Sequence, residues 1–207
     1  MRKGKGKIDV VLFDFGGVIA EEGFKQGLAA IAAANGLDEK AFVQAAFDAV
    51  YASGYVLGKA SEQAFWKELK EKTGLQGDNE SLMTEIFSRF VLRSWMMDLV
   101  RGLKAEKITT GILSDQTDML GKLDKRYDFF RWFDHIFNSY DMGKGKRDAT
   151  LFDDIALKLQ TEPGRILFID DDPGHVGRAM QRGWNALLYV NRETFEKDLE
   201  KILQRKG

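Results

Sequence analysis

Short apolar runs alternate with longer stretches of helical periodicity along this chain. The first run, Ile8 to Phe13, ends at Asp14 and is followed by two glycines, Gly16 and Gly17. An almost unbroken apolar run is typical of a strand that is buried on both faces inside a parallel sheet. The two glycines let the backbone turn sharply and approach a ligand closely. We therefore expect Asp14 at the carboxyl end of a buried strand, where open parallel sheets bind their ligands.

Between about residues 24 and 93 the pattern is helical throughout. The segment Phe24 to Ala34 predicts a first helix. Asp38 and Ser61 are suitable N-caps for a second and a third helix, because their side-chain oxygens accept hydrogen bonds from free backbone N–H groups. An apolar stripe from Leu82 to Phe90 predicts a fourth. Four helices without a strand between them indicate an inserted helical bundle.

After Trp95 the pattern changes to strands that alternate with helices. Strands are predicted at 108–113, 135–138, 165–169 and 186–190, and helices at 96–103, 117–126, 151–159, 176–182 and 195–203. Such alternation implies right-handed crossovers and a parallel sheet that is covered on both faces. We predict a three-layer, Rossmann-like α/β core with an inserted all-helical cap. The core would comprise residues 1–19 and 93–207, and the cap residues 20–92.

Composition excludes several classes of function. The chain has 31 basic and 32 acidic residues, so its net charge of −1 indicates no nucleic-acid or membrane partner. Without cysteine it has no disulfide or thiolate chemistry, and two histidines are too few for a histidine-rich zinc centre. The basic segment Arg2 to Lys7 is short and glycine-rich, as expected of a frayed terminal tail. No signal peptide or membrane span is predicted, which favours a cytoplasmic protein.

Polar side chains end three of the predicted strands. They are Asp14, then Ser114 with Asp115, then the triple acid Asp170–Asp172. Because the ends of parallel strands lie on one edge, these groups converge, and a divalent cation with oxygen ligands relieves the repulsion between carboxylates. Mg²⁺ is usually bound together with phosphate oxygens. Lys146 or Lys144, in the loop after the strand at 135–138, would meet such a phosphate as a point charge.

In this order the segments Asp14-Phe15-Gly16-Gly17-Val18, Leu113-Ser114, Lys146 and Phe168-Ile169-Asp170-Asp171 resemble the four motifs of the haloacid dehalogenase-like (HAD) hydrolase superfamily. The resemblance covers nearly the whole chain, and it is to the phosphatase-type branch with a helical cap inserted after the first motif. Each motif alone is weak, but the four in order are specific. An Asp-Phe-Gly triplet also occurs in protein kinases, but the kinase glycine loop and catalytic loop are missing here.

The resemblance implies a role for each matching residue. Asp14 would be the nucleophile that forms an aspartyl-phosphate. Mg²⁺ would be held by Asp14, the backbone carbonyl of Gly16 and Asp171, with Asp170 as a further ligand or as a residue that supports the ligands. Ser114 and Lys146 would bind the phosphoryl oxygens. Asp172, which precedes Pro173, is instead expected to cap a helix.

Two departures from the family pattern leave alternatives open. Phosphatases of the superfamily commonly carry an Asp general acid two residues after the nucleophile, where this chain has Gly16. Three alternatives follow. The first is a phosphatase that takes its acid from the cap or from water, or does without one; the second is a haloacid dehalogenase; the third is a catalytically weak binding or regulatory module. The segment Lys146-Arg147-Asp148-Ala149 replaces the usual Lys-Pro-Asp-Pro, which leaves Lys144 as a substitute cation.

The triple acid favours the first alternative, because the dehalogenase branch works without a metal. We therefore predict a Mg²⁺-dependent phosphomonoester hydrolase that acts on a small phosphorylated metabolite. The helical insertion should select the substrate. Lys59, Glu21 and Glu22 are candidates for that role by position alone, and the sequence predicts neither the substrate nor the oligomeric state.

Overall fold

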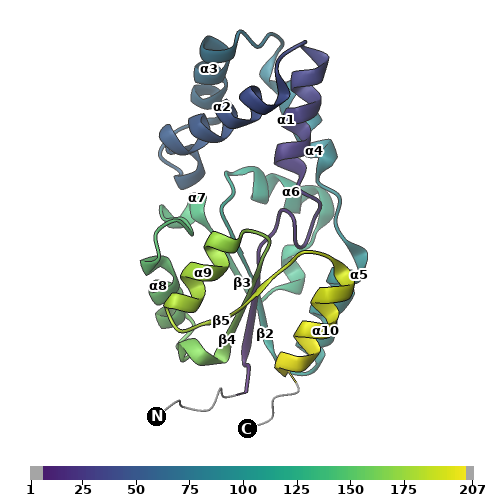
Figure 1. The fold of residues 1–207 in the computed structure, drawn as a ribbon, viewed down its shortest axis with the longest axis vertical. Coiled ribbons are helices and arrows are strands. Elements are labelled where there is room, and N and C mark those ends of the chain that lie inside the picture. The colour runs from purple at the N-terminus through teal and green to yellow at the C-terminus, as the bar shows by residue number, and fades with distance from the viewer. Residues whose placement is uncertain (1–6, 204–207) are drawn as a thin grey trace.

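A five-stranded parallel sheet forms the centre of the molecule in a computed structural model, which describes residues 7–203 (Figure 1). The strand order is β3-β2-β1-β4-β5. The strands are β1 (Val10–Phe13), β2 (Thr109–Ser114), β3 (His135–Asn138), β4 (Ile166–Asp170) and β5 (Asn185–Leu188). All four pairs of neighbouring strands are parallel, including the two pairs that β1 forms with β2 and with β4. The predicted Rossmann-like α/β sheet is confirmed, whereas the basic tail lies outside the described residues except for Lys7.

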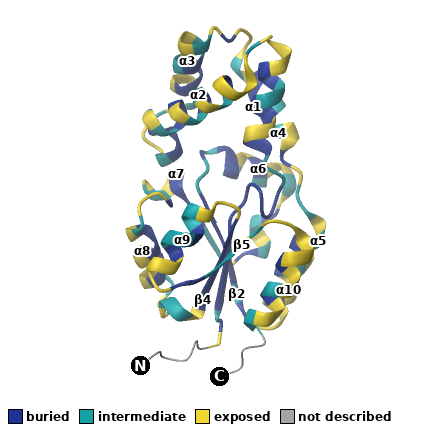
Figure 2. Cartoon of the chain, viewed as in Figure 1, coloured by how far each residue is buried: buried dark blue, intermediate teal, exposed yellow. Residues whose placement is uncertain are grey.

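Helices cover both faces of the sheet because alternate strand residues point to opposite sides. Leu12 and Phe168 pack with α8 (Thr150–Lys158) and α9 (Pro173–Gln181). Phe13 and Ile169 face the other way and belong to the cluster on the opposite side of the sheet. The helices that contribute apolar residues to this cluster include α5 (Ser94–Ala105), α6 (Met119–Tyr127) and α10 (Arg192–Leu203). Short turns are α7 (Ser139–Met142), η2 (Phe130–Trp132) and η3 (Pro163–Arg165). Figure 2 shows the strands buried between these helices.

Four helices between β1 and β2 lie beyond the carboxyl ends of the strands (Figure 1). They are α1 (Gly23–Ala34), α2 (Glu39–Ala52), α3 (Glu62–Thr73) and α4 (Asn79–Arg89), with the 3-10 turn η1 (Tyr55–Leu57) after α2. The predicted N-caps are confirmed, because Asp38 accepts from the Ala41 N–H and Ser61 from the Ala64 N–H. We call this group the helical insertion; its predicted limits at residues 20 and 92 stay a prediction. None of the helices within residues 7–203 has the length and apolar character needed to cross a bilayer.

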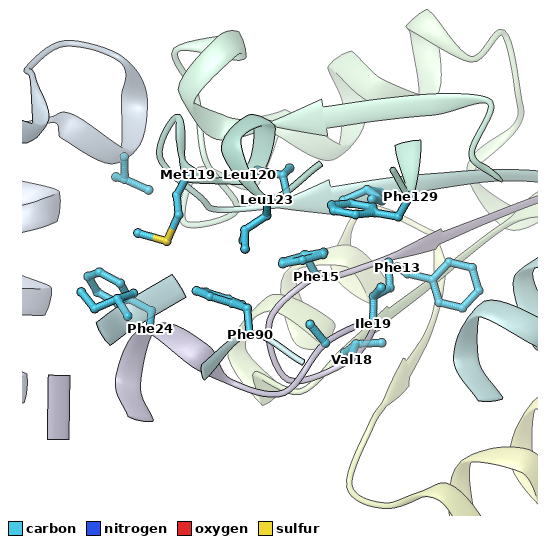
Figure 3. Close-up of a cluster of buried hydrophobic side chains, with 14 of the residues drawn as sticks. Phe13, Phe15, Val18, Ile19, Phe24, Phe90, Met119, Leu120, Leu123 and Phe129 are labelled. Carbon is cyan, nitrogen blue, oxygen red and sulfur yellow. The ribbon is translucent and has the colours of Figure 1, made fainter. Parts of the chain in front are cut away.

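Two adjacent chain segments join the helical insertion to the sheet. The Glu21 N–H donates to the Val91 carbonyl and the Arg93 N–H to the Ile19 carbonyl, both at 2.9 Å. Beside them, Phe15 stacks on Phe129 with ring centroids 5.0 Å apart (Figure 3). The apolar packing continues from β1 past this junction into the insertion (Figure 3). The loop after β1 is therefore fixed between the sheet and the insertion.

Candidate active site

Asp14 follows the last residue of the central strand β1. Its N–H donates to the Ile169 carbonyl of β4 at 2.8 Å, and its Oδ1 accepts from the Phe15 N–H at 2.7 Å. The side chain is 12% exposed and opens into a cavity. Burial raises the pKa of the Asp14 carboxyl well above its ordinary value, although the nearby Lys146 ammonium opposes that rise. The strand thus holds one carboxylate in a fixed position at the edge where ligands bind.

Lys146 is completely buried and bridges two strand ends. Its Nζ lies 2.8 Å from Asp14 Oδ2 and 2.6 Å from Asp170 Oδ2. Burial alone would lower the pKa of Lys146, but these two carboxylates raise it above its ordinary value. The same lysine holds the pKa of Asp170 well below the usual range in spite of burial. The predicted cation and the predicted acids therefore meet at one point.

Asp14, Asp170 and Asp171 bring carboxylate oxygens within 4.8 Å of one another, an arrangement that suits a metal ion. Both Asp170 oxygens already accept hydrogen bonds, one from Lys146 and one from the Asp172 N–H at 2.7 Å. Asp171 forms no ion pair with any described residue, and burial raises its pKa. The backbone makes room for it: Gly17 has φ +79°, and a Cβ there would lie 2.1 Å from Asp171 Oδ2.

Two further residues bind the Lys146 backbone, and a third contacts Asp170, the partner of its side chain. Asp115 accepts from the Lys146 N–H through both carboxylate oxygens, at 2.9 and 3.1 Å. Arg178 Nε donates to the Lys146 carbonyl at 2.7 Å, and His175 Nδ1 lies 3.2 Å from Asp170 Oδ2. His175 and Arg178 were not predicted. Because they lie three residues apart on α9, both side chains are on the same face of that helix. In the sequence this spacing, directly after the triple acid, is the feature that could have indicated that both face the acids.

A cavity of about 460 Å³ opens above Asp14, between the strand ends and the helical insertion. Ser114 and Lys146 line it from the sheet side, together with Gly16 and Asp171. The insertion contributes an apolar wall, with Phe24, Phe47, Val50, Tyr51 and Val56. Arg147 stacks on Tyr51, its guanidinium carbon 3.4 Å from the ring centroid, and links the two walls. The cavity thus combines a charged floor with an apolar roof.

Of the other predicted residues, one takes its expected place and three lie away from the cavity. Asp172 is the N-cap of α9, as predicted, because it accepts from the His175 N–H at 2.9 Å. Lys144 is not the substitute cation; its Nζ pairs with Asp154 at 2.6 Å and it does not line the cavity. Lys59 does not line it either. Glu21 pairs with Arg93 at 2.8 Å instead.

Glu22 does line the cavity and is half-buried. It is the N-cap of α1, where its Oε1 accepts from the Lys25 N–H at 3.1 Å. Its other oxygen lies over Gly16, 2.6 Å from the point where a Cβ of residue 16 would be. Burial raises the pKa of the Glu22 carboxyl. A carboxyl group from the start of the insertion thus occupies the space next to the loop that follows Asp14.

Known proteins resemble this chain in sequence or in fold. A curated chloroplastic protein of Arabidopsis thaliana, flavin mononucleotide hydrolase 1, is 23% identical over 96% of this chain and 79% of its own length. The fold is also similar to that of a HAD family enzyme of Bacteroides thetaiotaomicron, whose structure was solved in complex with magnesium and inorganic phosphate. The two structures superpose with a TM-score of 0.70 at 20% sequence identity, over 88% of this chain and 94% of that chain.

A second solved structure is a dehalogenase of the same fold. The L-2-haloacid dehalogenase of Xanthobacter autotrophicus, with chloropropionic acid covalently bound, gives a TM-score of 0.66 at 16% identity, over 94% of this chain and 83% of that one. At such identities the two structures establish the fold and not the reaction. The model of the haloacid dehalogenase-like hydrolase family matches residues 8–177, from β1 into α9. Because that match spans most of the chain and includes Asp14, Lys146 and the acids that follow β4, the protein is an enzyme that belongs to the haloacid dehalogenase-like hydrolases.

Proposed function

We propose that the enzyme is a Mg²⁺-dependent phosphomonoester hydrolase that acts through an aspartyl-phosphate on Asp14. The observation that carries this proposal is the convergence of Asp14, Asp170 and Asp171 oxygens within 4.8 Å, beside the buried ammonium of Lys146. A phosphate dianion is repelled by one carboxylate and more strongly by three. Only a site that adds positive charge can bring such an ester to Asp14, and this site offers a lysine and a place for a divalent cation.

The residues of the site would divide the reaction into two displacements. An Asp14 oxygen attacks phosphorus, the bond to the leaving oxygen breaks, and an aspartyl-phosphate forms. Water then attacks the same phosphorus, the bond to Asp14 breaks, and inorganic phosphate leaves. Lys146 and Ser114, which line the cavity beside Asp14, would bind phosphoryl oxygens throughout.

The carboxylates present fit a magnesium ion. Asp14 and Asp171, with the Gly16 carbonyl, would hold the ion, and Asp170 would support them by fixing Lys146 and His175. A bound Mg²⁺ supplies the charge that screens the repulsion between the nucleophile and the phosphate. Gly17 contributes by leaving the Asp171 carboxylate space to approach the nucleophile loop.

We propose a small phosphorylated metabolite with an apolar or aromatic portion as the substrate. The apolar wall formed by Phe24, Phe47 and Tyr51 supports this choice, since it faces the charged floor across the cavity. The name of the Arabidopsis relative refers to flavin mononucleotide, a phosphate ester with a planar ring system. Flavin mononucleotide is therefore the first natural ester to test. The cytoplasmic location and the absence of a nucleic-acid partner stay predictions.

Haloacid dehalogenation is the second candidate, because one structural neighbour of this fold carries it out. In that reaction the nucleophile attacks carbon, and no phosphate dianion has to be neutralised. The three converging carboxylates and the approach of Asp171 to Gly17 favour phosphoryl chemistry over this alternative.

Phosphate release from p-nitrophenyl phosphate and from flavin mononucleotide, measured with Mg²⁺ and with EDTA, tests the proposal. Asp14→Asn should abolish release, whereas Asp9→Asn is the matched control, because Asp9 precedes β1 at the opposite end of the same strand and pairs with Arg165. A protein that keeps its rate in EDTA, or an active Asp14→Asn variant, would contradict the proposal. Chloride release from 2-chloropropionate without phosphatase activity would establish the dehalogenase instead.

A further inference from the structure

The proposed reaction requires two proton transfers for which no assigned residue accounts. An alkyl leaving oxygen must gain a proton when its bond to phosphorus breaks, and the attacking water must lose one when it opens the aspartyl-phosphate. Asp14 is the nucleophile, and Lys146 is locked between two carboxylates. Gly16, the residue over the nucleophile, has no side chain.

Most acidic groups that line the cavity are already committed. Both oxygens of Asp115 accept from the Lys146 N–H. Asp172 caps α9 by accepting from the His175 N–H. Asp171 belongs to the three-carboxylate cluster proposed to hold the cation.

Glu22 differs from these groups. In the described part of the chain it forms no ion pair, and its hydrogen bond from the Lys25 N–H uses Oε1 alone. Its Oε2 is directed over Gly16, 2.6 Å from the position of a Cβ on that residue. The free oxygen therefore lies where a side chain of residue 16 would begin.

The local fold explains how residues six apart in sequence meet. After Asp14 the chain makes a tight loop, closed by the Ala20 N–H donating to the Phe15 carbonyl at 2.9 Å and by a bridge between Gly16 and Ala20. The loop ends at the start of α1, where capping fixes the Glu22 side chain. The carboxyl group is thus held above the nucleophile loop by the first turn of the helical insertion.

We propose that Glu22 is the general acid and base of the reaction and supplies the carboxyl group that Gly16 lacks. In the first displacement the Glu22 carboxyl gives its proton to the leaving oxygen as that oxygen separates from phosphorus. In the second, the resulting carboxylate takes a proton from the water that attacks phosphorus, and Asp14 departs as a carboxylate. The proton of Glu22 is restored, and the sum is one ester and one water converted to one alcohol and one phosphate.

This inference rests on the proposed phosphatase function, and a comparison of two substrates separates the two. The test measures kcat/KM for p-nitrophenyl phosphate, whose leaving group departs without a proton, and for an alkyl phosphate, whose leaving group requires one. Glu22→Gln keeps the shape of the side chain. It should lower kcat/KM for the alkyl ester about 10²–10⁴-fold and change the aryl ester much less. After an acid quench, this variant should also retain more aspartyl-phosphate than the wild type, because water lacks its base.

Two further variants sharpen the result. Glu39→Gln changes an exposed carboxylate in the first turn of α2 that does not line the cavity, so the ratio of the two substrates should stay as in the wild type. Gly16→Asp combined with Glu22→Ala moves the carboxyl to residue 16 after making room for its Cβ, and should restore part of the alkyl rate.

Three outcomes decide the matter. If the wild type hydrolyses both esters and Glu22→Gln keeps their ratio, Glu22 is not the acid, while the phosphatase function stands. If the wild type releases phosphate from neither ester, the function fails and the role of Glu22 fails with it. A changed ratio that the double variant reverses supports the assignment, because a merely structural defect would slow both substrates together.

Discussion

Replacing Lys146 by methionine is the sharpest test of the electrostatics of the site. Methionine keeps most of the length and apolar volume of the lysine but removes the only charge that separates Asp14 from Asp170 in the described structure. The lysine Nζ lies 2.8 Å from one carboxylate and 2.6 Å from the other, and its side chain is 0% exposed. Water therefore does not replace the lost ammonium without rearrangement of the site.

The expected loss is large because two buried carboxylates remain without their partner. Removing one member of a buried ion pair destabilises proteins by about 3–5 kcal/mol. For a chain of this size each kcal/mol shifts Tm by about 2–4 °C, so we expect Lys146→Met to lower Tm by about 6–20 °C in metal-free buffer. Phosphatase activity should disappear as well, since no cation is left to bind the phosphoryl oxygens beside Asp14.

The loss should depend on pH with a defined sign. Lys146 lowers the pKa of Asp170 and opposes the rise of the Asp14 pKa, so both pKa values rise in the variant. A group whose folded pKa lies above its unfolded value of about 3.9 loses stability as the pH rises through the folded pKa. The gap between variant and wild type should therefore be narrower near about pH 4 than near about pH 8, because the variant binds more protons when folded. Mg²⁺ should stabilise the variant more than the wild type, because its charge replaces part of the lost one.

Thermal unfolding followed by circular dichroism, in EDTA and in Mg²⁺ at both pH values, measures these effects. Lys144→Met is the matched control: that lysine pairs with the half-exposed Asp154, and the change should cost less than about 1 kcal/mol. If Lys146→Met unfolds at the wild-type temperature at neutral pH without metal, the carboxylates do not depend on this cation and the description of the site is wrong.

Two other substitutions test the supports of the site. Gly17→Ala should abolish Mg²⁺-dependent activity, because its Cβ would lie 2.1 Å from Asp171 Oδ2. Gly36→Ala is the control, since Gly36 also has a positive φ but no atom lies within 4 Å of the added Cβ. Comparing the Mg²⁺ affinity and the stability of the two variants therefore separates the effect of the contact from that of backbone strain. Tyr55→Phe removes the hydrogen bond from η1 to the Asp118 carboxylate that joins the insertion to the sheet side. It should cost about 1.5–3 kcal/mol in urea unfolding, and an unchanged midpoint would show that this bond does not stabilise the junction.

The fold could be predicted because strands and helices differ in the spacing of their apolar residues. Continuous apolar runs such as Val10–Phe13 identify strands buried on both faces, and their parallel pairing follows from the helices between them. Strand ends were predicted less well: β2 begins at Thr109 and continues through Ser114, one residue later at each end than predicted. The turn α7, with four residues, is too short to show any periodicity and was missed.

The site residues that follow strands could be predicted from the sequence, whereas the positions of the residues in loops could not. Asp14 and Asp171 follow buried strands, so the shared edge of the sheet brings them together. The choice between Lys144 and Lys146 depends on the Asp115 carboxylate, which receives the Lys146 N–H and turns that side chain inward. No pattern in the sequence shows such a contact across 31 residues. Glu22 was a candidate by position, but only the closed loop after β1 shows that it returns to Gly16.

Arg93 connects the loop after β1 to the first turn of the insertion. This residue follows the helical insertion, yet its guanidinium donates to the Gly17 carbonyl, to the Val18 carbonyl at 3.0 Å and to Glu21 at 2.8 and 2.9 Å. The loop that carries Gly16 and the first turn that carries Glu22 are thus tied to the same side chain. A rotation of the insertion about this junction must either move the loop with it or break these bonds. The position of Glu22 over Gly16 is therefore set by the junction itself, and it does not depend on how the distant helices of the insertion contact a substrate.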